Sequence, residues 1–382
     1  MKVLLIAPGP VDHALACAEG LADHAKVVLA APARLYRDIR PAPDPRIDLR
    51  LLDWPRTRSL RNAVLLARLL RLARACRPDV IHVLGNATLW LNAIAPALAR
   101  IAPLVTTVHD VSVHPGDRET RRLPDWAARL MARRSDHLVV HGEGLKVAAV
   151  AHFGMDASRV HVVPHPAITR YARLGPVPAT TSPRGVGMLH ALMFGRLFAY
   201  KGVDDLIRAE ALLVDRLPGL TLTLAGRGDN PSLLRGLMGD PARYDIRHGH
   251  VADGDVAALF HAADVVVLPY VEASQSGVLT IAASFGKPVI ATDVGELGPT
   301  VRRHGLGLVV PPHDPAALAE ALLTLGRDPV LRGRLALQAA DWARGPIRPD
   351  QVGARMARLY RDILDMPPGP ISVDMAEPGR FS

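Results

Sequence analysis

Short apolar runs alternate along the chain with longer segments whose apolar residues recur with the period of a helix. In the first half the strand-like runs are "KVLLIAP", "AKVVLAA", "DVIHVLG", "PLVTTVHD", "DHLVVHG" and "RVHVVPH". Segments 12–24 and 60–77, which lie between such runs, are amphipathic. Because strands that alternate with helices usually pair in parallel, this half predicts a parallel sheet with helices on both faces.

The second half begins the same pattern again. Its strand-like runs are "GMLHALMFGR", "LTLTLAG", "YDIRHGH", "DVVVLPY", "KPVIATD" and "GLGLVVPP". Residues 167–187, which separate the halves, are rich in Pro, Gly, Ser and Thr and predict a linker. The chain is therefore expected to be an α/β protein with two Rossmann-like parallel-sheet domains that face each other across a cleft.

This pattern gives predicted domain boundaries. Residues 1–166 form the N-terminal domain and residues 188–345 the C-terminal domain, while 346–366 form a helix that could pack back on the N-terminal domain. The tail 367–382 is expected to be disordered, because it is rich in Pro, Gly and polar residues. Ligands bind beyond the carboxyl ends of parallel strands, so the loops that follow strands are where chemistry is expected.

Composition narrows the class of protein. With 49% hydrophobic and 22% charged residues, the chain is globular. The apolar run in the start "MKVLLIAPGP" is shorter than the apolar core of a secretory signal, so no such signal is expected. The apolar region 88–105 is interrupted by proline and arginine, so no membrane span is expected. The chain has 2 cysteines, Cys17 and Cys76, which favours a reducing, cytoplasmic compartment.

The positive charge is concentrated in the first half. Residues 1–166 carry 23 Lys and Arg against 15 Asp and Glu, within a net charge of +9. Such asymmetry favours an anionic partner, such as a membrane lipid, a phosphorylated ligand or nucleic acid, although a general bias toward arginine would also produce it. Of these partners, nucleic acid is not expected.

The helix predicted at 59–77 carries much of this charge. Its apolar face is Leu66, Leu69, Leu70 and Ala73, and its basic residues are Arg61, Arg68, Arg71 and Arg74. One interpretation is an ordinary solvated face. The other is peripheral attachment to the anionic inner face of the cell membrane, to which segment 118–134 with Trp126 could contribute.

Two segments carry candidate chemistry. Arg196 and Lys201 follow the first strand of the second half, where a guanidinium and an ammonium together could hold a diphosphate. The polar turn that contains Gln275, Ser276 and Gly277 leads into an apolar helix, whose N-terminal N–H groups would attract an anion. The plainer interpretations are solvated surface charges and an ordinary helix cap.

The order of "FGRL…KGVDDLIRA", "LTLAGRGD", "HGHV", "LFHAADVVVLPY", "SFGKPVIATDVGEL" and "GLGLVVPPHDPAALAEAL" resembles glycosyltransferase family 4, a group of retaining GT-B enzymes. The resemblance implies transfer of a sugar from a nucleotide-sugar with retention. It implies that Arg196 and Lys201 bind the donor diphosphate, and that Gln275, Ser276 and Gly277 can meet donor phosphate or sugar. His109 in "VTTVHD" would lie near the transferred sugar, and Gly9 would let the backbone approach the donor.

The chain departs from the family at one position pair. The family commonly carries two glutamates eight residues apart, and the second contacts the nucleotide ribose. Ala273 and Ile281 occupy those positions here, with Glu272 one place too early. The residue that binds the ribose therefore stays open.

No metal site, cofactor or covalent nucleophile is expected, because the histidines are scattered along the sequence and no acidic pair has a suitable spacing. The preferred function is a retaining hexosyltransferase-type enzyme that uses a UDP- or GDP-sugar and a lipid-linked or saccharide acceptor, for example in surface polysaccharide or glycolipid synthesis. The alternatives are a non-catalytic nucleotide-sugar-binding GT-B protein and another GT-B enzyme such as a nucleotide-sugar epimerase. The base, the sugar, the acceptor, the linkage and the oligomeric state stay open.

Overall fold

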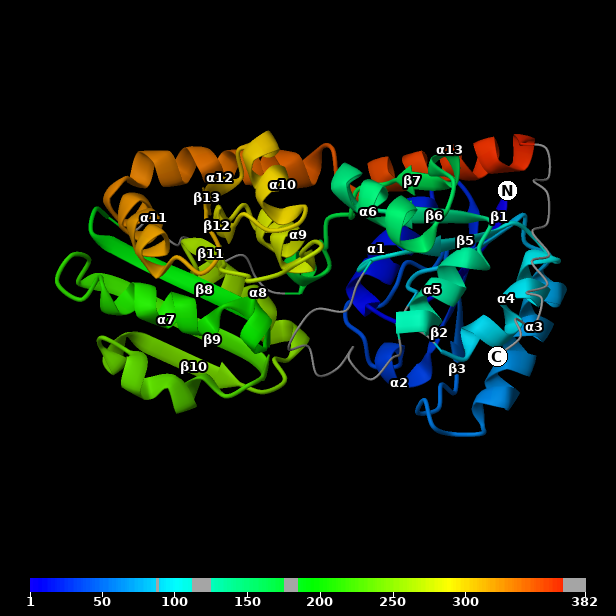
Figure 1. The fold of residues 1–382 in the computed structure, drawn as a ribbon, viewed down its shortest axis with the longest axis horizontal. Helices are drawn as coiled ribbons and strands as arrows, with labels where there is room; N and C mark the ends of the chain where they lie inside the picture. The colour runs from blue at the N-terminus through cyan, green and yellow to red at the C-terminus, as the bar shows by residue number, and fades with distance from the viewer. Residues whose placement is uncertain (87–88, 112–124, 175–184, 367–382) are drawn as a thin grey trace, which may run out of the picture.

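The structure, a computed structural model, describes residues 1–86, 89–111, 125–174 and 185–366, which form two lobes side by side (Figure 1). The first lobe is built on a 7-stranded parallel sheet in the order β3-β2-β1-β4-β5-β6-β7. Its strands are β1 Lys2–Ile6, β2 Lys26–Pro32, β3 Asp48–Leu52, β4 Val80–Val83, β5 Leu104–Thr107, β6 His137–Val140 and β7 Val160–Val162. Its helices are α1 Val11–Leu21, α2 Ala33–Tyr36, α3 Asn62–Cys76, α4 Leu91–Ala99, α5 Asp125–Arg133 and α6 Glu143–Phe153.

The second lobe repeats this architecture with a 6-stranded parallel sheet in the order β10-β9-β8-β11-β12-β13. Its strands are β8 Met188–Leu197, β9 Gly219–Gly228, β10 Tyr244–His248, β11 Val265–Leu268, β12 Val289–Thr292 and β13 Gly307–Val310. Its helices are α7 Val203–Ala211, α8 Asp253–Ala262, α9 Gly277–Ser284, α10 Leu297–His304, α11 Pro315–Arg327 and α12 Pro329–Arg344, and α13 Pro349–Asp365 follows them. The prediction of two Rossmann-like parallel sheets is confirmed.

The strands form because their side chains are apolar on both sides of the sheet. In β1, Leu4, Leu5 and Ile6 are fully buried, with helices packed over both faces. Continuous apolar runs of this kind are typical of parallel strands, which have no face in contact with water. The alternation of such runs with amphipathic helices is what made both sheets predictable.

Helix α1 is buried on two sides, which its amphipathic pattern did not indicate. The last helix, α13, crosses from the second lobe and lies along α1, as Figure 1 shows. The two backbones approach closely at Gly20 and Gly353. An added Cβ at Gly20 would lie 1.9 Å from the carbonyl oxygen of Pro349, where α13 begins, and one at Gly353 would lie 1.9 Å from the carbonyl oxygen of Gly20. Only glycine permits this approach, so α13 is fixed against the first lobe at this crossing.

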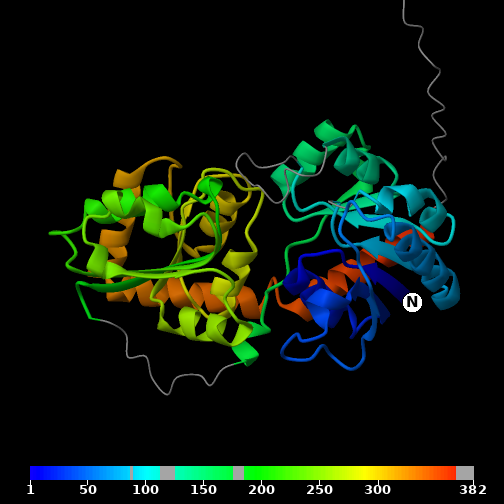
Figure 2. The same ribbon diagram turned by 90° about the horizontal axis from the view of Figure 1, so that it is seen from below.

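The connections between the lobes are only partly described. Residues 175–184 of the predicted linker and the tail 367–382 lie outside the described residues, and so does much of segment 118–134. Figure 2 shows the two lobes from below, joined by the chain that follows β7 and by the passage from α12 to α13. The exact domain boundaries stay a prediction. Within the described ranges, no helix combines the length and apolar character needed to cross a bilayer.

Candidate functional site

Arg196 and Lys201 lie beside two tyrosine rings at the carboxyl end of the second sheet. Arg196 is near the end of β8, and its guanidinium carbon lies 5.9 Å from the ring centre of Tyr200. The Lys201 ammonium lies 3.4 Å from the ring centre of Tyr270, which follows β11. An aromatic face attracts a cation, so these rings hold both positive charges near one point.

A glycine makes this approach possible. Gly202 has a φ of 68°, and an added Cβ there would lie 1.9 Å from the carbonyl oxygen of Pro269. The connection after β8 therefore passes directly over the end of β11, because residue 202 has no side chain. This contact brings Lys201 onto Tyr270.

The polar turn before α9 reaches the same place from the neighbouring strand. The Tyr270 hydroxyl and the Ser276 Oγ are 3.1 Å apart, and α9 begins at Gly277. Burial raises the pKa of Tyr270 to about 12, and the positive charge of Arg196 partly opposes this rise. Arg196, Lys201, Ser276 and the N-terminus of α9 thus form one electropositive group, which we call the cationic group.

His109 lies on the other lobe, two residues after β5, and meets the second lobe directly. Its Nδ1 is 3.3 Å from the amide nitrogen of Gln275 and 3.2 Å from Nε2 of His141. A neutral imidazole nitrogen can donate to His141 or accept from Gln275, but it cannot do both. Among the described residues, the buried Nε2 of His109 has no hydrogen-bond partner, so this atom is left for a ligand.

Four histidines gather around this point, although they are far apart in the sequence. His109, His141 and His165 follow the neighbouring strands β5, β6 and β7, and His13 lies in the first turn of α1. The ring centre of His13 is 4.5 Å from that of His109, 5.1 Å from His141 and 4.7 Å from His165. We call these four residues the histidine cluster.

The histidine cluster is uncharged at neutral pH. Burial lowers the pKa of His109 to about 4, against the opposing effect of Asp110, and lowers that of His165 to about 4. It also lowers the pKa of His13 and His141 well below 6.5, with the neighbouring histidines adding to the shift. The histidines are scattered only along the sequence. In the fold, His109, His141 and His165 lie together because the carboxyl ends of the adjacent parallel strands β5, β6 and β7 are at one edge of the sheet.

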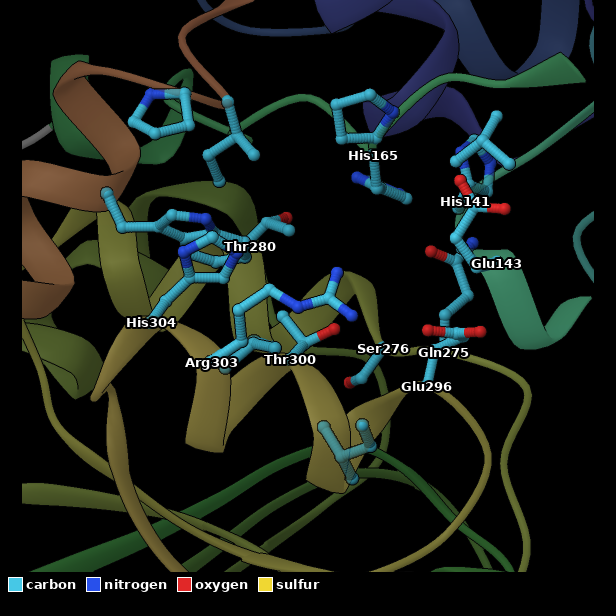
Figure 3. A pocket seen from close by; sticks show the side chains of 18 of the residues that line it. His141, Glu143, His165, Gln275, Ser276, Thr280, Glu296, Thr300, Arg303 and His304 are labelled. Carbon is cyan, nitrogen blue, oxygen red and sulfur yellow. The ribbon is translucent and has the colours of Figure 1, made fainter.

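The described residues of the two lobes enclose at least two cavities between them. One, of about 420 Å³, has His141, His165, Gln275 and Ser276 along one side and Arg303 on α10 along another (Figure 3). The other is bounded on the second lobe by the last residues of β8 and β9 and the turn after β10, and on the first lobe by α1 and the α2 region. Its lining includes Arg34, Arg40, Arg196 and Arg227. Arg170 and the acids Asp12, Asp38 and Asp253 line it as well, and because arginines outnumber acids the cavity suits an elongated anionic ligand.

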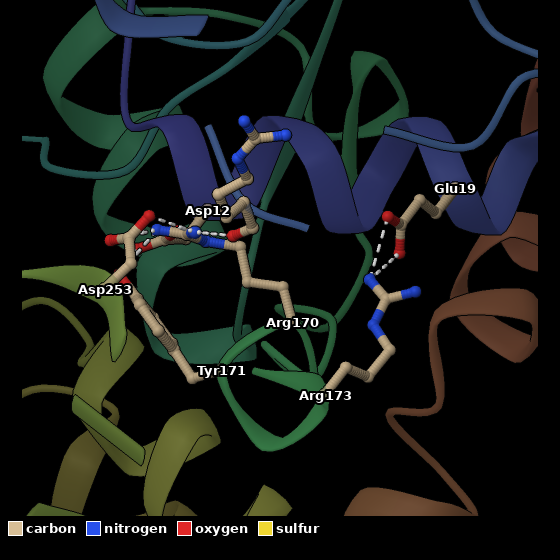
Figure 4. Close-up of polar contacts among 7 residues, drawn as sticks. Asp12, Glu19, Arg170, Tyr171, Arg173 and Asp253 are labelled. Carbon is tan, nitrogen blue, oxygen red and sulfur yellow. Dashed lines mark hydrogen bonds and ion pairs between the residues drawn. The ribbon is translucent and has the colours of Figure 1, made fainter. Parts of the chain in front are cut away.

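Ion pairs close the lobes on each other. Figure 4 shows Arg170, which precedes the linker's undescribed part, between Asp12 of α1 and Asp253 of α8. Its two terminal nitrogens donate to the two oxygens of Asp253 at 2.7 and 2.9 Å, and Tyr171 donates to Asp12 at 2.9 Å. The Arg170 side chain is only 8% exposed, whereas its partners Asp12 and Asp253 are 26% and 31% exposed, so the guanidinium is shielded from water and the carboxylates only in part.

A second interlobe contact lies beside the histidine cluster. Glu296 of the second lobe accepts a hydrogen bond at 3.1 Å from the backbone nitrogen of Leu145, in the first turn of α6. An added Cβ at Gly142 would lie 2.2 Å from the Glu296 side chain, so residue 142 has room for the carboxylate only as glycine. A negative charge at the N-terminus of a helix is favourable, and the contact stabilises the closed arrangement.

The remaining sequence candidates are placed as follows. Gly9 lies in the loop after β1 with a φ of 150° and open space on its Cβ side, but no described contact joins it to the cationic group. Ala273 and Ile281 are both buried in the second lobe's core, 5% and 4% exposed, and because their side chains are apolar neither side chain can hydrogen-bond a ligand. Residues that the sequence did not single out are His13, His141, His165 and Tyr270.

Two family models match the chain. "Glycosyltransferase Family 4" matches residues 9–170 and "Glycosyl transferases group 1" matches residues 189–328. A D-inositol 3-phosphate glycosyltransferase of Pseudarthrobacter chlorophenolicus is 34% identical over 70% of this chain and 68% of its own length. A glycogen synthase of Mycobacterium tuberculosis is 30% identical over 75% of this chain and 69% of its own length.

Solved structures share the two-lobed fold. Anabaena HepE in complex with UDP-glucose aligns with a TM-score of 0.70 at 20% identity, over 95% of this chain and 100% of that one. The sucrose-phosphate synthase of Thermosynechococcus elongatus aligns with a TM-score of 0.67 at 19% identity, over 95% of this chain and 99% of that one. At these identities the likeness concerns the fold.

Proposed function

The chain belongs to glycosyltransferase family 4, with the predicted GT-B fold, and we propose that it transfers a sugar from a nucleoside-diphosphate sugar to an acceptor with retention. One observation carries the proposal more than any other. Gln275, which contacts His109 of the first lobe, directly precedes Ser276, whose Oγ lies 3.1 Å from the hydroxyl of Tyr270, the ring that Lys201 covers.

In this proposal the cationic group binds the donor diphosphate. Arg196 contributes a planar fork of N–H donors and Lys201 a compact charge, while the N-terminus of α9 adds backbone N–H groups. As the sugar leaves, negative charge grows on the diphosphate oxygen. Donors that are already in place stabilise that charge in the transition state, which is where they accelerate the reaction.

The nucleoside would occupy the arginine-lined cavity. Arg196 lines this cavity and also belongs to the cationic group. In a nucleotide-sugar that extends from the cavity to Tyr270, the diphosphate would therefore lie next to Arg196. UDP and GDP are the candidate nucleotides, and UDP-glucose is the ligand of the Anabaena protein with the same fold. With Ile281 apolar and buried, the ribose must be bound by another residue.

His109 would contact the transferred sugar. Its Nε2 is buried and lacks a partner among the described residues, and a sugar hydroxyl would supply one. Burial keeps the imidazole neutral at pH 7, so it acts as a hydrogen-bonding group and not as a positive charge. We assign no covalent nucleophile, and retention would follow from attack of the acceptor on the face from which the diphosphate leaves.

The acceptor and the cellular location are further parts of the proposal. Arg61, directly before α3, and Arg68, Arg71 and Arg74 on α3 are exposed, and Trp126 on α5 is 56% exposed. Helices α3 and α5 both pack against α4, and exposed cationic side chains together with an exposed tryptophan suit an anionic membrane surface. We propose a cytoplasmic enzyme that binds the inner face of the cell membrane and uses a lipid-linked or saccharide acceptor.

The first experiment is a thermal-shift panel of UDP-, GDP-, ADP- and TDP-sugars with the purified protein. A ligand at a hundredfold excess over its Kd stabilises the folded state by about 2.7 kcal/mol. The stabilising donor is then incubated with candidate acceptors, and the anomeric configuration of the product is read by NMR. Inversion would contradict the proposed stereochemistry, and binding without transfer or donor hydrolysis would favour a non-catalytic sugar-nucleotide-binding protein.

A further inference from the structure

The histidine cluster contains a set of ring nitrogens that could share one metal ion. One ring nitrogen each of His13, His109 and His141 lies within 4.8 Å of those of the other two. These residues belong to α1 and to the ends of β5 and β6, so the sheet and its covering helix hold them together. We propose that they bind a divalent transition-metal ion such as Zn²⁺, and that this ion displaces Gln275 from His109.

The spacing suits zinc. Two nitrogens on a tetrahedral Zn²⁺ lie about 3.4 Å apart, because each Zn–N bond is about 2.0–2.1 Å. Nε2 of His141 and Nδ1 of His109 are 3.2 Å apart, close to this value. The third histidine, His13, has its ring centre 4.5 Å from that of His109, so a small rotation of its side chain completes a set of three ligands.

The surroundings of the cluster orient two of its histidines for metal binding. Nδ1 of His141 donates to the carbonyl of Val163 at 2.9 Å, which leaves the lone pair of a neutral ring on Nε2. His165 makes the equivalent bond to its own neighbour, the carbonyl of Pro166, at 2.8 Å. A backbone carbonyl that accepts from the far nitrogen is the usual outer partner of a metal-bound histidine. His165, whose ring centre is 4.7 Å from that of His13, lies beside the three ligands, and water can fill the fourth position of the ion.

The ion has a route to these nitrogens. His141 and His165 line the 420 Å³ cavity of Figure 3. His109 and His141 are both partly exposed to solvent. Asp110, directly after His109, is a carboxylate whose charge acts on the cluster and would offset part of the positive charge of the ion. The cluster therefore has ligands, outer partners, a nearby negative charge and an entry path.

Metal binding and the closed arrangement compete for one atom. An ion on Nδ1 of His109 occupies the space beside that atom where the amide of Gln275 now lies, 3.3 Å away. Because Nε2 of His141 is an acceptor, Nδ1 of His109 carries the proton in the metal-free cluster, and on metal binding this proton moves to Nε2 of His109 or passes to solvent. The metal-bound protein consequently loses a contact between its lobes, and transfer should slow. This last step rests on the proposed function, whereas the binding step does not.

The test of binding uses the full chain after removal of metals by a chelator, with Co²⁺ as the spectroscopic probe. We expect saturation at one ion per chain, visible absorption bands of a four-coordinate histidine site, and displacement by Zn²⁺. His13→Gln and His141→Gln should each weaken Co²⁺ binding by at least about tenfold. His137→Gln is the matched control, because His137 pairs with His161 outside the cluster.

The wild-type titration alone can overturn the inference, even when a variant fails to fold. Absence of a saturable cobalt spectrum does so, and so does equal affinity in folded His13→Gln and His137→Gln. When a donor and acceptor are known, Zn²⁺ should inhibit transfer by the wild type and spare His13→Gln. Cobalt binding without any transfer activity would count against the proposed function only, and transfer without cobalt binding would count against the metal site only.

Discussion

The amide of Gln275 lies 3.3 Å from Nδ1 of His109, although 166 residues separate them and they belong to different lobes. Gln275 precedes α9 at the carboxyl end of the second sheet, and His109 follows β5 at the carboxyl end of the first. The two sheets thus face each other with their ligand-binding edges, and the structure represents a closed arrangement of the lobes.

Arg196→Ala and Lys201→Ala should each lower kcat/KM for transfer by about 10²–10³-fold, because each removes a donor that stabilises charge in the transition state. The melting temperature should change little, since neither side chain lies in the apolar core. Arg247→Ala is the matched control, because Arg247 is an exposed arginine on β10 that pairs with Asp245. Wild-type rates in both site variants would exclude the proposed diphosphate site.

His109→Ala and Lys201→Ala should differ in kind. The free nucleoside diphosphate has no sugar for His109 to contact, so His109→Ala should lower the transfer rate far more than it lowers affinity for that ligand. Lys201→Ala should weaken both. Calorimetric titration of the matching nucleoside diphosphate, beside transfer rates, measures the difference. Equal loss of nucleotide affinity in the two variants would show that His109 does not act on the sugar.

Arg170→Ala should destabilise the folded protein by about 1.5–3 kcal/mol, because it removes the charge-assisted hydrogen bonds of a buried guanidinium and leaves the partly exposed carboxylates of Asp12 and Asp253 without their partner. Arg173→Ala is a close control. Arg173 also pairs with an acid of α1, Glu19, but it is 48% exposed, so its loss should cost at most about 1 kcal/mol. Denaturant unfolding of both variants makes the comparison. Similar losses would mean that Arg170 does not hold the lobes together.

Acid should destabilise the protein through its buried histidines. His82 of β4 lies between the Tyr360 hydroxyl and Thr107 Oγ1, and burial lowers its pKa from 6.5 to about 3. Between these two pH values the unfolded chain binds a proton that the folded chain does not. The free energy of unfolding therefore falls as the pH drops below 6.5, by up to about 1.4 kcal/mol per pH unit for each such histidine.

The variant His82→Gln isolates one of these protons. Its free energy of unfolding should fall less steeply than that of the wild type between pH 6.5 and about 5, since one proton fewer is taken up on unfolding. Urea titrations at several pH values measure both slopes. An unchanged slope would show that His82 titrates normally in the folded protein.

Replacement of Arg61, Arg68 and Arg71, which lie on α3 or directly before it, by Gln should weaken binding to vesicles that contain anionic lipid. Added salt should weaken wild-type binding too. The control is the same change at three exposed arginines of the second lobe, Arg208 on α7 and Arg334 and Arg344 on α12. Vesicle sedimentation measures both. Binding that is equally strong to neutral lipid, or equally reduced in the control, would argue against a membrane-facing α3.

The cationic group was accessible from the sequence because its parts are local. Arg196 and Lys201 are five residues apart on one strand and the turn after it, and Gln275 and Ser276 stand just before an apolar helix. The rule that ligands bind beyond the carboxyl ends of parallel strands then places these segments at one edge of one sheet. What the pattern could not give was Tyr270, whose ring lies between them only because Gly202 lets two loops touch.

The sequence by itself determined the two parallel sheets, their approximate extents and the strand ends where polar residues accumulate, because the period of apolar residues is a local property. Tertiary structure alone decided which strands are neighbours, and thereby united His109, His141 and His165, each of which ends a separate strand-like run in the sequence. It also decided that α13 returns to cover α1 and that Gln275 reaches His109. These are contacts between residues far apart along the chain, and they depend on how whole sheets and helices pack, which no local pattern encodes.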